Sequence, residues 1–428
     1  MSNNTEIKIV SPETVGLSTK RLERLDELVH ELIDSGDLPG VLTMVMRHGQ
    51  VVHFNSRGHM DMESKKPLAK DSLFRMYSMT KPVTATAIMM LYEEGKLMLD
   101  DPVSKYIPSF ANQEVITHEW PEGKSRYSPR GRVYTTPVER DMTIRDLLTH
   151  TAGLASPRLT PIIYSKELTD AIGGSLFLPP ENGKASPRHS IREGVEKLGR
   201  IPLSFQPGSD WQYGHEFDVL GVLIEIISGK TLEEFFRQNI FGPLGMDDTS
   251  FVLSNEKLQR LTTEYTWDES WKLKVYEKPQ NAIKLKEAKD TFSGLGDFGG
   301  IVSTITDYSR FTQMLLNRGE LNGIRLLSPK TVELMSANHT HELFVHLRGY
   351  GWGYGFSLGL MNDPTRSLCI SSAGLYGWSG ASCTYFFIDP AEEMIGLAFS
   401  QVLGYGYKPG FRFHQQFEKA IYQAVISD

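Results

Sequence analysis

The strand-like segments of this chain lie near its two ends, and this placement constrains the fold more than any other feature of the sequence. Near the N-terminus, VLTMVMRHGQVVHFNSRG (residues 41–58) has two β-rich runs on either side of His48-Gly49, which predicts a hairpin. Residues 18–36 carry an apolar stripe of helical period, with Ser18 placed as N-cap and Gly36 as stop. The N-terminal region therefore predicts a helix followed by a strand pair.

The second strand-rich region follows residue 300. A helix capped by Thr304 and Asp307 is expected first. Three β-like stretches and a final amphipathic helix come after it, at residues 367–372, 381–389, 393–401 and 411–427. Between about 82 and 290 the pattern is helices separated by long loops rich in proline, glycine and charge, such as LPPENGKASPRHS. Strands and helices at both ends predict an α/β (α+β) domain built from residues 1–82 and 290–428, with a mainly α-helical domain inserted at 83–289.

A net charge of −7 at pH 7 and the lack of long apolar runs narrow the class of protein. A mildly acidic chain gives no electrostatic reason to bind nucleic acid or an anionic membrane surface, so neither partner is expected. No run approaches the roughly 18 apolar residues of a membrane span, and MSNNTEIKIV lacks the pattern of a signal peptide. Cys369 and Cys383 are the only two cysteines, which is typical of a reducing compartment. A cytoplasmic enzyme of undetermined oligomeric state is the expectation.

A hydroxyl and an amine stand together at the start of an apolar helix in FRMYSMTKPVTATAIMML (residues 74–91). Ser78 and Lys81 are three residues apart, nearly one helical turn, so their side chains leave the same face. Pro82 is tolerated only in the first helical turn, which places the helix start near Ser78. Free backbone N–H groups there favour developing negative charge, and a deprotonated lysine can activate the serine. An N-cap serine followed by a surface lysine explains the same letters, because S-x-x-K is common by chance.

Two later segments supply further candidates. Tyr213 lies in a glycine-flanked loop before an apolar helix, and Trp378-Ser379-Gly380 enters a strand. Separately, Tyr213 is equally well a packed aromatic, and the glycines are equally well turn residues. Taken in order, S-x-x-K, Y-G-x and x-x-G before a strand resemble the serine β-lactamase and penicillin-binding-protein superfamily. The flanking segments LLTHTAGL, DVLGVLIE, GGIVSTITDYSRF and GYGWGYGFSLG resemble its class C branch, and most of all the family VIII carboxylesterases.

The resemblance runs from about residue 18 to the C-terminus and implies a β-lactamase-like fold, an antiparallel sheet flanked by helices, with the active site in the cleft between the two predicted domains. It implies that Ser78 is the acylated nucleophile, that Lys81 orients and deprotonates it, and that Tyr213 is a general base in acylation. A phenol acts as a base at neutral pH only beside a cation, which agrees with a neighbouring lysine. The backbone N–H groups of Ser78 and Ala381 would form the oxyanion hole. No metal or cofactor is implied.

Two departures from the superfamily pattern bear on the substrate. His215 occupies the Asn position of Y-x-N, and Trp378-Ser379-Gly380 replaces Lys-Thr-Gly. These four residues are the expected substrate-binding positions. Because the replaced lysine is the cation that reads a β-lactam carboxylate, the resemblance predicts a serine carboxylesterase acting on small short- to medium-chain esters. A β-lactamase, D-aminopeptidase or acyltransferase with the same residues remains an alternative, as does a non-catalytic binding homologue.

Other sequence motifs give only weak indications of function. Residues 294–299 match GxGxxG, but a charged stretch precedes them instead of a strand, which disfavours a dinucleotide site. His341-Glu342 followed by His346 misses the HExxH zinc motif by one residue. The chain has no GxSxG elbow, which argues against an α/β-hydrolase. His150 in LLTHTAGL is expected to be a structural hydrogen-bonding residue and not a catalytic base.

Overall fold

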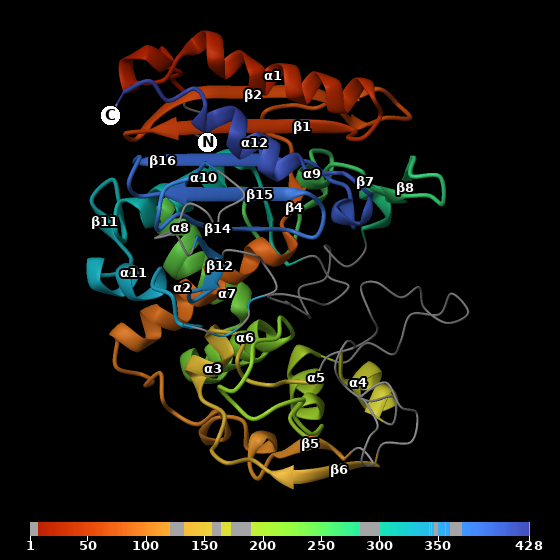
Figure 1. Cartoon of the computed structure of the whole chain (residues 1–428), viewed down its shortest axis with the longest axis vertical. Helices are drawn as coiled ribbons and strands as arrows, with labels where there is room; N and C mark the ends of the chain where they lie inside the picture. Colours follow the sequence, from red (N-terminus) through yellow and green to blue (C-terminus); the bar gives the residue numbers. More distant parts are fainter. Residues whose placement is uncertain are drawn as a thin grey trace.

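The two ends of the chain meet in one antiparallel sheet, as the sequence predicts (Figure 1). The computed structural model describes residues 343 and 345 and the ranges 7–119, 132–155, 164–172, 190–282, 300–341, 350–355, 357–359 and 370–427. Within this part of the chain, eight strands pair in the order β12-β13-β14-β15-β16-β1-β2-β3. They are β1 Gly40–Arg47, β2 Gln50–Asp61, β3 Lys66–Pro67, β12 Tyr350–Trp352, β13 Ser357–Gly359, β14 Tyr376–Ser379, β15 Thr384–Asp389 and β16 Met394–Phe399.

The junction between the two ends is the pairing of β1 with β16, where Leu42 lies opposite Phe399. Every residue of β1 is buried. Alternate residues of this strand belong to different cores: Leu42 and Met44 pack in one cluster, and Val41 and Val45 in another. Successive side chains of a strand point to opposite faces, so a central strand covered on both sides buries side chains on each face.

The hairpin predicted at His48-Gly49 joins β1 to β2. Both turn residues have positive φ, 50° for His48 and 72° for Gly49. A two-residue turn of this kind matches the right-handed twist of the flanking strands.

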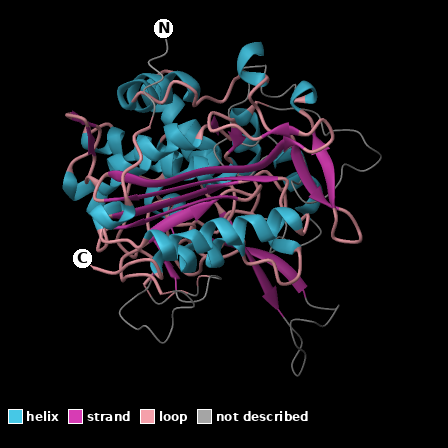
Figure 2. Ribbon diagram, turned by 90° about the horizontal axis from the view of Figure 1, so that it is seen from above, coloured by secondary structure: helices cyan, strands magenta, loops and turns pink. Residues whose placement is uncertain are grey.

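Helices cover both faces of the sheet (Figure 2). On one face α1 Thr19–Asp34 packs with the C-terminal helix α12 Phe413–Tyr422, and their apolar residues share a core with Val41 and Val45. On the other face lies α10 Ile305–Leu316, whose Phe311 joins the cluster of Leu42. The predicted caps are confirmed: the Ser18 side chain accepts from Arg21 N, and the Thr304 side chain accepts from Asp307 N. No helix in the described ranges is long and apolar enough to cross a membrane.

Two predicted elements near the C-terminus differ from the structure. The final helix ends at Tyr422 and not near 427, because the last residues hydrogen-bond to the N-terminal segment: Ile426 N donates to Gly16 O at 2.9 Å. Of the strand expected at 367–372, residues 370–372 are not a strand, and 367–369 lie outside the described residues. Ser372 O accepts from Leu375 N in a turn, and the strand β14 begins only at Tyr376.

The predicted helical insertion contains most of the remaining helices, several of which form the lower half of Figure 1. They begin with α2 Thr80–Glu93, which runs down from the sheet. The others in this region are α3 Ile144–Leu148, α4 Ser165–Ile172, α5 Ile191–Leu198, α6 Glu216–Ser228, α7 Leu232–Phe236, α8 Gly242–Leu244 and α9 Asn255–Leu258, and α11 Pro329–Met335 follows α10. Short strand pairs complete the described elements: β4 Phe74–Arg75 with β9 Val302–Ser303, β5 Glu114–Glu119 with β6 Arg132–Pro137, β7 Glu264–Trp267 with β8 Leu273–Glu277, and β10 Glu320–Leu321 with β11 Ile324–Arg325.

The chain returns to the sheet before residue 290, the boundary predicted for the helical domain. Thr263 N donates to Met60 O at 2.9 Å, and Tyr265 N donates to Gln401 O at 3.0 Å. β7 therefore packs against both terminal segments although its sequence lies inside the predicted insertion. The domain boundaries themselves stay a prediction.

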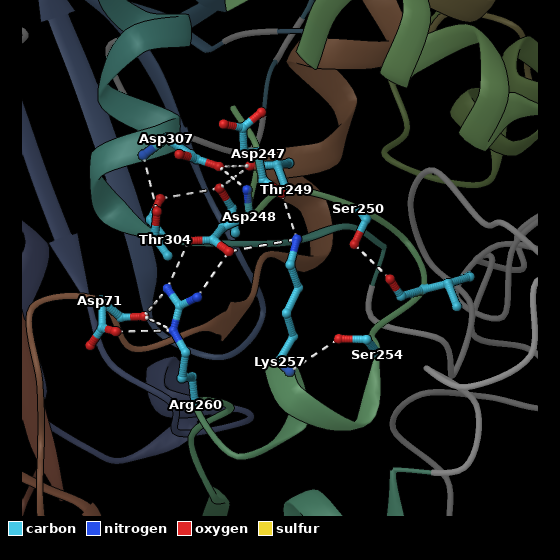
Figure 3. A network of polar contacts seen from close by, with 12 residues as sticks. Asp71, Asp247, Asp248, Thr249, Ser250, Ser254, Lys257, Arg260, Thr304 and Asp307 are labelled. Atoms are coloured by element: carbon cyan, nitrogen blue, oxygen red, sulfur yellow. Dashed lines mark hydrogen bonds and ion pairs between the residues drawn. The ribbon is translucent and has the colours of Figure 1, made fainter. Parts of the chain in front are cut away.

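A cluster of charges fastens this returning segment to α10 (Figure 3). Arg260 pairs with both carboxylate oxygens of Asp248 at 2.7 and 2.9 Å, and its Nε lies 3.1 Å from Asp71. Asp248 N in turn donates to Asp307 at 2.8 Å, and Thr249 Oγ1 donates to the same oxygen at 3.0 Å. Burial raises the pKa of Asp307 to about 6.

Candidate active site

Ser78 and Lys81 lie together at the start of α2. Ser78 is in the middle of a 3₁₀ turn, Tyr77–Met79, that leads directly into the helix. Lys81 is fully buried, and its Nζ donates to Ser78 Oγ at 3.3 Å. The turn is fixed from two sides, because Met76 N donates to Ile301 O at 2.9 Å and Tyr308 OH donates to Met79 O at 2.8 Å. The structure thus brings the hydroxyl and the amine of S-x-x-K within hydrogen-bond distance.

The residue before the serine has an unusual backbone conformation. Tyr77 has φ 47°, in the left-handed region that favours glycine. For a bulky residue this conformation costs on the order of 1–3 kcal/mol, and it persists only where the surroundings impose it. The kink points the chain into α2 with Ser78 at the turn.

The ring of Tyr213 lies next to the amine of Lys81. The Nζ of Lys81 is 4.7 Å from the centre of the Tyr213 ring and 5.9 Å from that of Phe217. Both aromatic residues come from the start of α6, Tyr213 just before it and Phe217 in its first turn. A buried ammonium is stabilised by the electron-rich faces of such rings. The predicted association of Tyr213 with the S-x-x-K pair is therefore present in the fold.

The third motif reaches the same point from the sheet. Trp378 lies at the end of β14, and its indole N–H donates to the hydroxyl oxygen of Tyr213 at 3.1 Å. Ser379 Oγ accepts from Tyr405 OH at 3.3 Å. At Gly380, a Cβ would lie 2.2 Å from Thr384 Oγ1 and 2.5 Å from Met76 O, so the strand end approaches the nucleophile turn too closely for a side chain. These contacts explain why a glycine stands at this point of the sequence.

Ala381 lies in the turn between β14 and β15. Cys383 N donates to Gly380 O at 3.3 Å across this turn, and Gly404 N donates to Ala381 O at 3.0 Å. The carbonyl oxygen of Ala381 is thus held by the backbone N–H of Gly404. Its N–H as an oxyanion-hole donor stays a prediction.

His215 differs in position from the other predicted residues. It is the N-cap residue of α6, is 7% exposed, and its Nδ1 lies 3.1 Å from Asp218 of the same helix. The His215 side chain thus contacts the helix that carries Phe217. A substrate contact for His215 stays a prediction.

His150 packs against the ring of Tyr213. It is fully buried, its ring centre is 4.5 Å from that of Tyr213, and its Nδ1 is 2.6 Å from Glu216. Burial lowers the pKa of His150, and the neighbouring Glu216 opposes this shift. This agrees with the structural role expected from the sequence.

The site also contains two tryptophans that the sequence analysis did not predict. Trp352 contacts Trp378 edge to face, with ring centres 4.6 Å apart, and Trp211 lies 5.5 Å from Trp352. With Val345, Tyr213 and Trp378 they form one apolar cluster. Trp211 is two residues before Tyr213 and Trp352 lies within GYGWGYG, but neither position shows a periodicity that would have predicted this contact.

The remaining motifs lie wholly or partly outside the described residues. Residues 294–299, together with Glu342 and His346, lie outside the described residues. Over the ranges that the structure describes, no group of three or more His, Cys, Asp or Glu side chains is placed to hold a metal ion.

A serine whose hydroxyl contacts a buried lysine, with a tyrosine over that lysine and a strand end beside both, is the arrangement of a serine hydrolase. The chain belongs to the β-lactamase family, whose sequence profile matches residues 25–414. It is a serine hydrolase of the β-lactamase and penicillin-binding-protein superfamily.

Individual relatives agree with this assignment. The chain is 32% identical to an uncharacterized protein of Mycobacterium tuberculosis over 382 residues, which is 86% of each chain. It is 27% identical to esterase EstB of Burkholderia gladioli over 86% of this chain and 87% of the esterase. Among solved structures, EstCE1, described as a hydrolase with promiscuous acyltransferase activity, superposes with a TM-score of 0.74 at 24% identity, over 94% of this chain and 99% of the other. The last comparison shows the predicted β-lactamase-like fold.

Proposed function

We propose that this protein is a carboxylesterase of the family VIII type that cleaves small, uncharged carboxylic esters through an acyl-enzyme on Ser78. The observation that carries the proposal is the indole of Trp378, which contacts Tyr213 and replaces the lysine of the superfamily motif Lys-Thr-Gly. An aromatic face suits an uncharged acyl or alcohol group and leaves a substrate carboxylate without a cation. The similarity to esterase EstB supports the same reaction class.

The reaction would run in two acyl-transfer steps. Ser78 Oγ attacks the ester carbonyl carbon while its proton passes to the Lys81–Tyr213 pair, and the oxyanion is held by the N–H groups of Ser78 and Ala381. The tetrahedral intermediate expels the alcohol oxygen, which takes up that proton, and the acyl group stays on Ser78. Water then attacks the acyl carbon and gives one proton to the same pair. The bond from the acyl carbon to Ser78 Oγ breaks, Oγ takes up that proton, and the carboxylic acid leaves.

A panel of p-nitrophenyl esters from acetate to laurate tests the proposal, with Ser78→Ala as the control for background hydrolysis. We expect the highest kcat/KM among the short and medium chains. A matched pair, the butyrate and the hemisuccinate, separates size from charge, and the neutral butyrate should be the better substrate. Absence of ester hydrolysis above the Ser78→Ala control, or preference for the charged ester, would contradict the proposal.

A further inference from the structure

One buried carboxylate contacts a side chain on each of the two segments that form the expected oxyanion hole. Glu264, on β7, is 1% exposed. Its Oε1 accepts a hydrogen bond from Tyr77 OH at 2.8 Å and another from the Ser382 hydroxyl. Tyr77 directly precedes Ser78, and Ser382 directly follows Ala381. A single oxygen atom therefore joins the neighbours of the two N–H donors, which lie about 300 residues apart in the chain.

Both neighbours sit where the backbone needs support. The left-handed conformation of Tyr77, φ 47°, is unfavourable for a side chain of its size. Ser382 lies in the turn that connects β14 to β15, next to Cys383, which has φ 66°. A hydrogen bond from each side chain to a fixed acceptor opposes relaxation of these two strained turns.

The acceptor is fixed by a charge network. Arg75 is buried, and its Nε lies 3.7 Å from Glu264 Oε2. The same guanidinium donates to Glu277 at 2.7 Å and to Thr262 O at 3.0 Å. A buried ion pair contributes little net stability, because the desolvation of both charges offsets their attraction. What it gives here is a carboxylate held in one orientation, with one oxygen toward Arg75 and the other toward the two hydroxyls.

We propose that Glu264 is a positioning residue that sets the separation of the Ser78 and Ala381 N–H groups and so aligns the oxyanion hole. This inference rests on the proposed esterase function, because the hole matters only if a tetrahedral oxyanion forms. Glu264 acts through its hydrogen bonds with Tyr77 and Ser382. An oxyanion-hole donor contributes about 10²–10³ to kcat when it is aligned. Loss of the alignment should therefore remove a part of that factor and leave substrate binding largely intact.

The test compares three substitutions at Glu264 and its neighbour. Glu264→Ala removes the acceptor, and we expect kcat for a p-nitrophenyl ester to fall about 10- to 100-fold with KM changed less than about threefold. Glu264→Gln keeps an oxygen that both hydroxyls can reach, so it should recover most of kcat. Glu277→Gln is the matched control: its amide oxygen can still accept from Arg75, so Glu264 stays in place while a neighbouring charge is lost, and kcat should stay within about twofold of wild type.

A second pair of substitutions keeps the test decisive if Glu264→Ala fails to fold. The double variant Tyr77→Phe/Ser382→Ala leaves the Arg75–Glu264 pair intact and removes only the two donors. It should show the same loss in kcat, and adding Glu264→Ala to it should lower kcat no further. Glu264→Ala and Tyr77→Phe/Ser382→Ala should also react more slowly than wild type with a phosphonate ester, whose tetrahedral adduct places an oxyanion in the hole.

The outcomes separate the two claims. If wild type is active and the Tyr77→Phe/Ser382→Ala variant keeps full kcat, the role of Glu264 is overturned and the proposed function stands. An equal loss in Glu264→Gln and Glu264→Ala would also overturn it, because charge and not the hydrogen bonds would then matter. A wild type that neither hydrolyses esters nor reacts with the phosphonate would overturn the proposed function, and this inference with it.

Discussion

Exchanging Trp378 for lysine should shift the enzyme from esters toward β-lactams. In the present structure the indole donates to Tyr213 at 3.1 Å and packs against Trp352, so the site offers a substrate carboxylate an apolar face. A hydrogen bond between an ammonium and a carboxylate contributes about 1.5–3 kcal/mol. At about 1.4 kcal/mol for each factor of ten, Trp378→Lys should raise the ratio of β-lactam to ester kcat/KM by about ten- to a hundredfold.

The assay measures kcat/KM for p-nitrophenyl butyrate and for nitrocefin in wild type, Trp378→Lys and Trp378→Gln. The glutamine variant loses the indole and its hydrogen bond to Tyr213 without gaining a charge, so it corrects for damage to the site. The lysine variant should exceed the glutamine variant in the nitrocefin-to-ester ratio, and 0.5 M salt should reduce the difference. Equal ratios in the two variants would refute the reasoning, since a cation at this position would then have no effect on substrate choice.

Two further predictions concern the proton-transfer pair and the charge cluster of Figure 3. Lys81→Ala and Tyr213→Phe should each lower kcat about a thousandfold or more. The double variant should be little worse, because groups that act as one unit give non-additive losses. A double variant whose loss in kcat is the product of the two single losses would contradict the pairing. Because burial raises the pKa of Asp307 from 3.8 to about 6, its ionisation costs stability as the pH rises through that range. Between pH 4 and pH 7 the free energy of urea unfolding of wild type should therefore fall by about 2–3 kcal/mol relative to that of Asp307→Asn. A difference between the two proteins that stays constant with pH would disprove the shift.

The parts of the fold that could be predicted from sequence are those with local signals. The period of the helix after Ser18 and the turn at His48-Gly49 are set by neighbouring residues, and both are confirmed. The errors near the C-terminus have tertiary causes. Residues 370–372 have β-like composition but lead into a turn, and the Ser372 N–H donates to the Asp389 side chain at the end of β15 instead of to a strand backbone. The last helix stops early because the chain pairs with Gly16, more than 400 residues away.

The same division holds for the candidate site. Ser78 and Lys81 share one helical turn, so their contact follows from spacing alone. Their approach to Tyr213 and Trp378 depends on the packing of the sheet against the helical region, which only the resemblance to a known family implied. Glu264 gave no signal at all, because an isolated glutamate on a short strand is ordinarily solvent-exposed. Its burial becomes understandable only when Arg75 is seen beside it.

The central claim is that Ser78 becomes covalently acylated during turnover, and labelling with a fluorophosphonate tests it most directly. Intact-mass spectrometry should show one adduct per chain, and peptide mapping should place it on the peptide that contains Ser78, with esterase activity lost in proportion to labelling. Ser78→Ala should take up no label, whereas Ser379→Ala, which keeps the nucleophile, should still be modified. An adduct on any other residue, or an unlabelled wild type that still hydrolyses esters, would contradict the account.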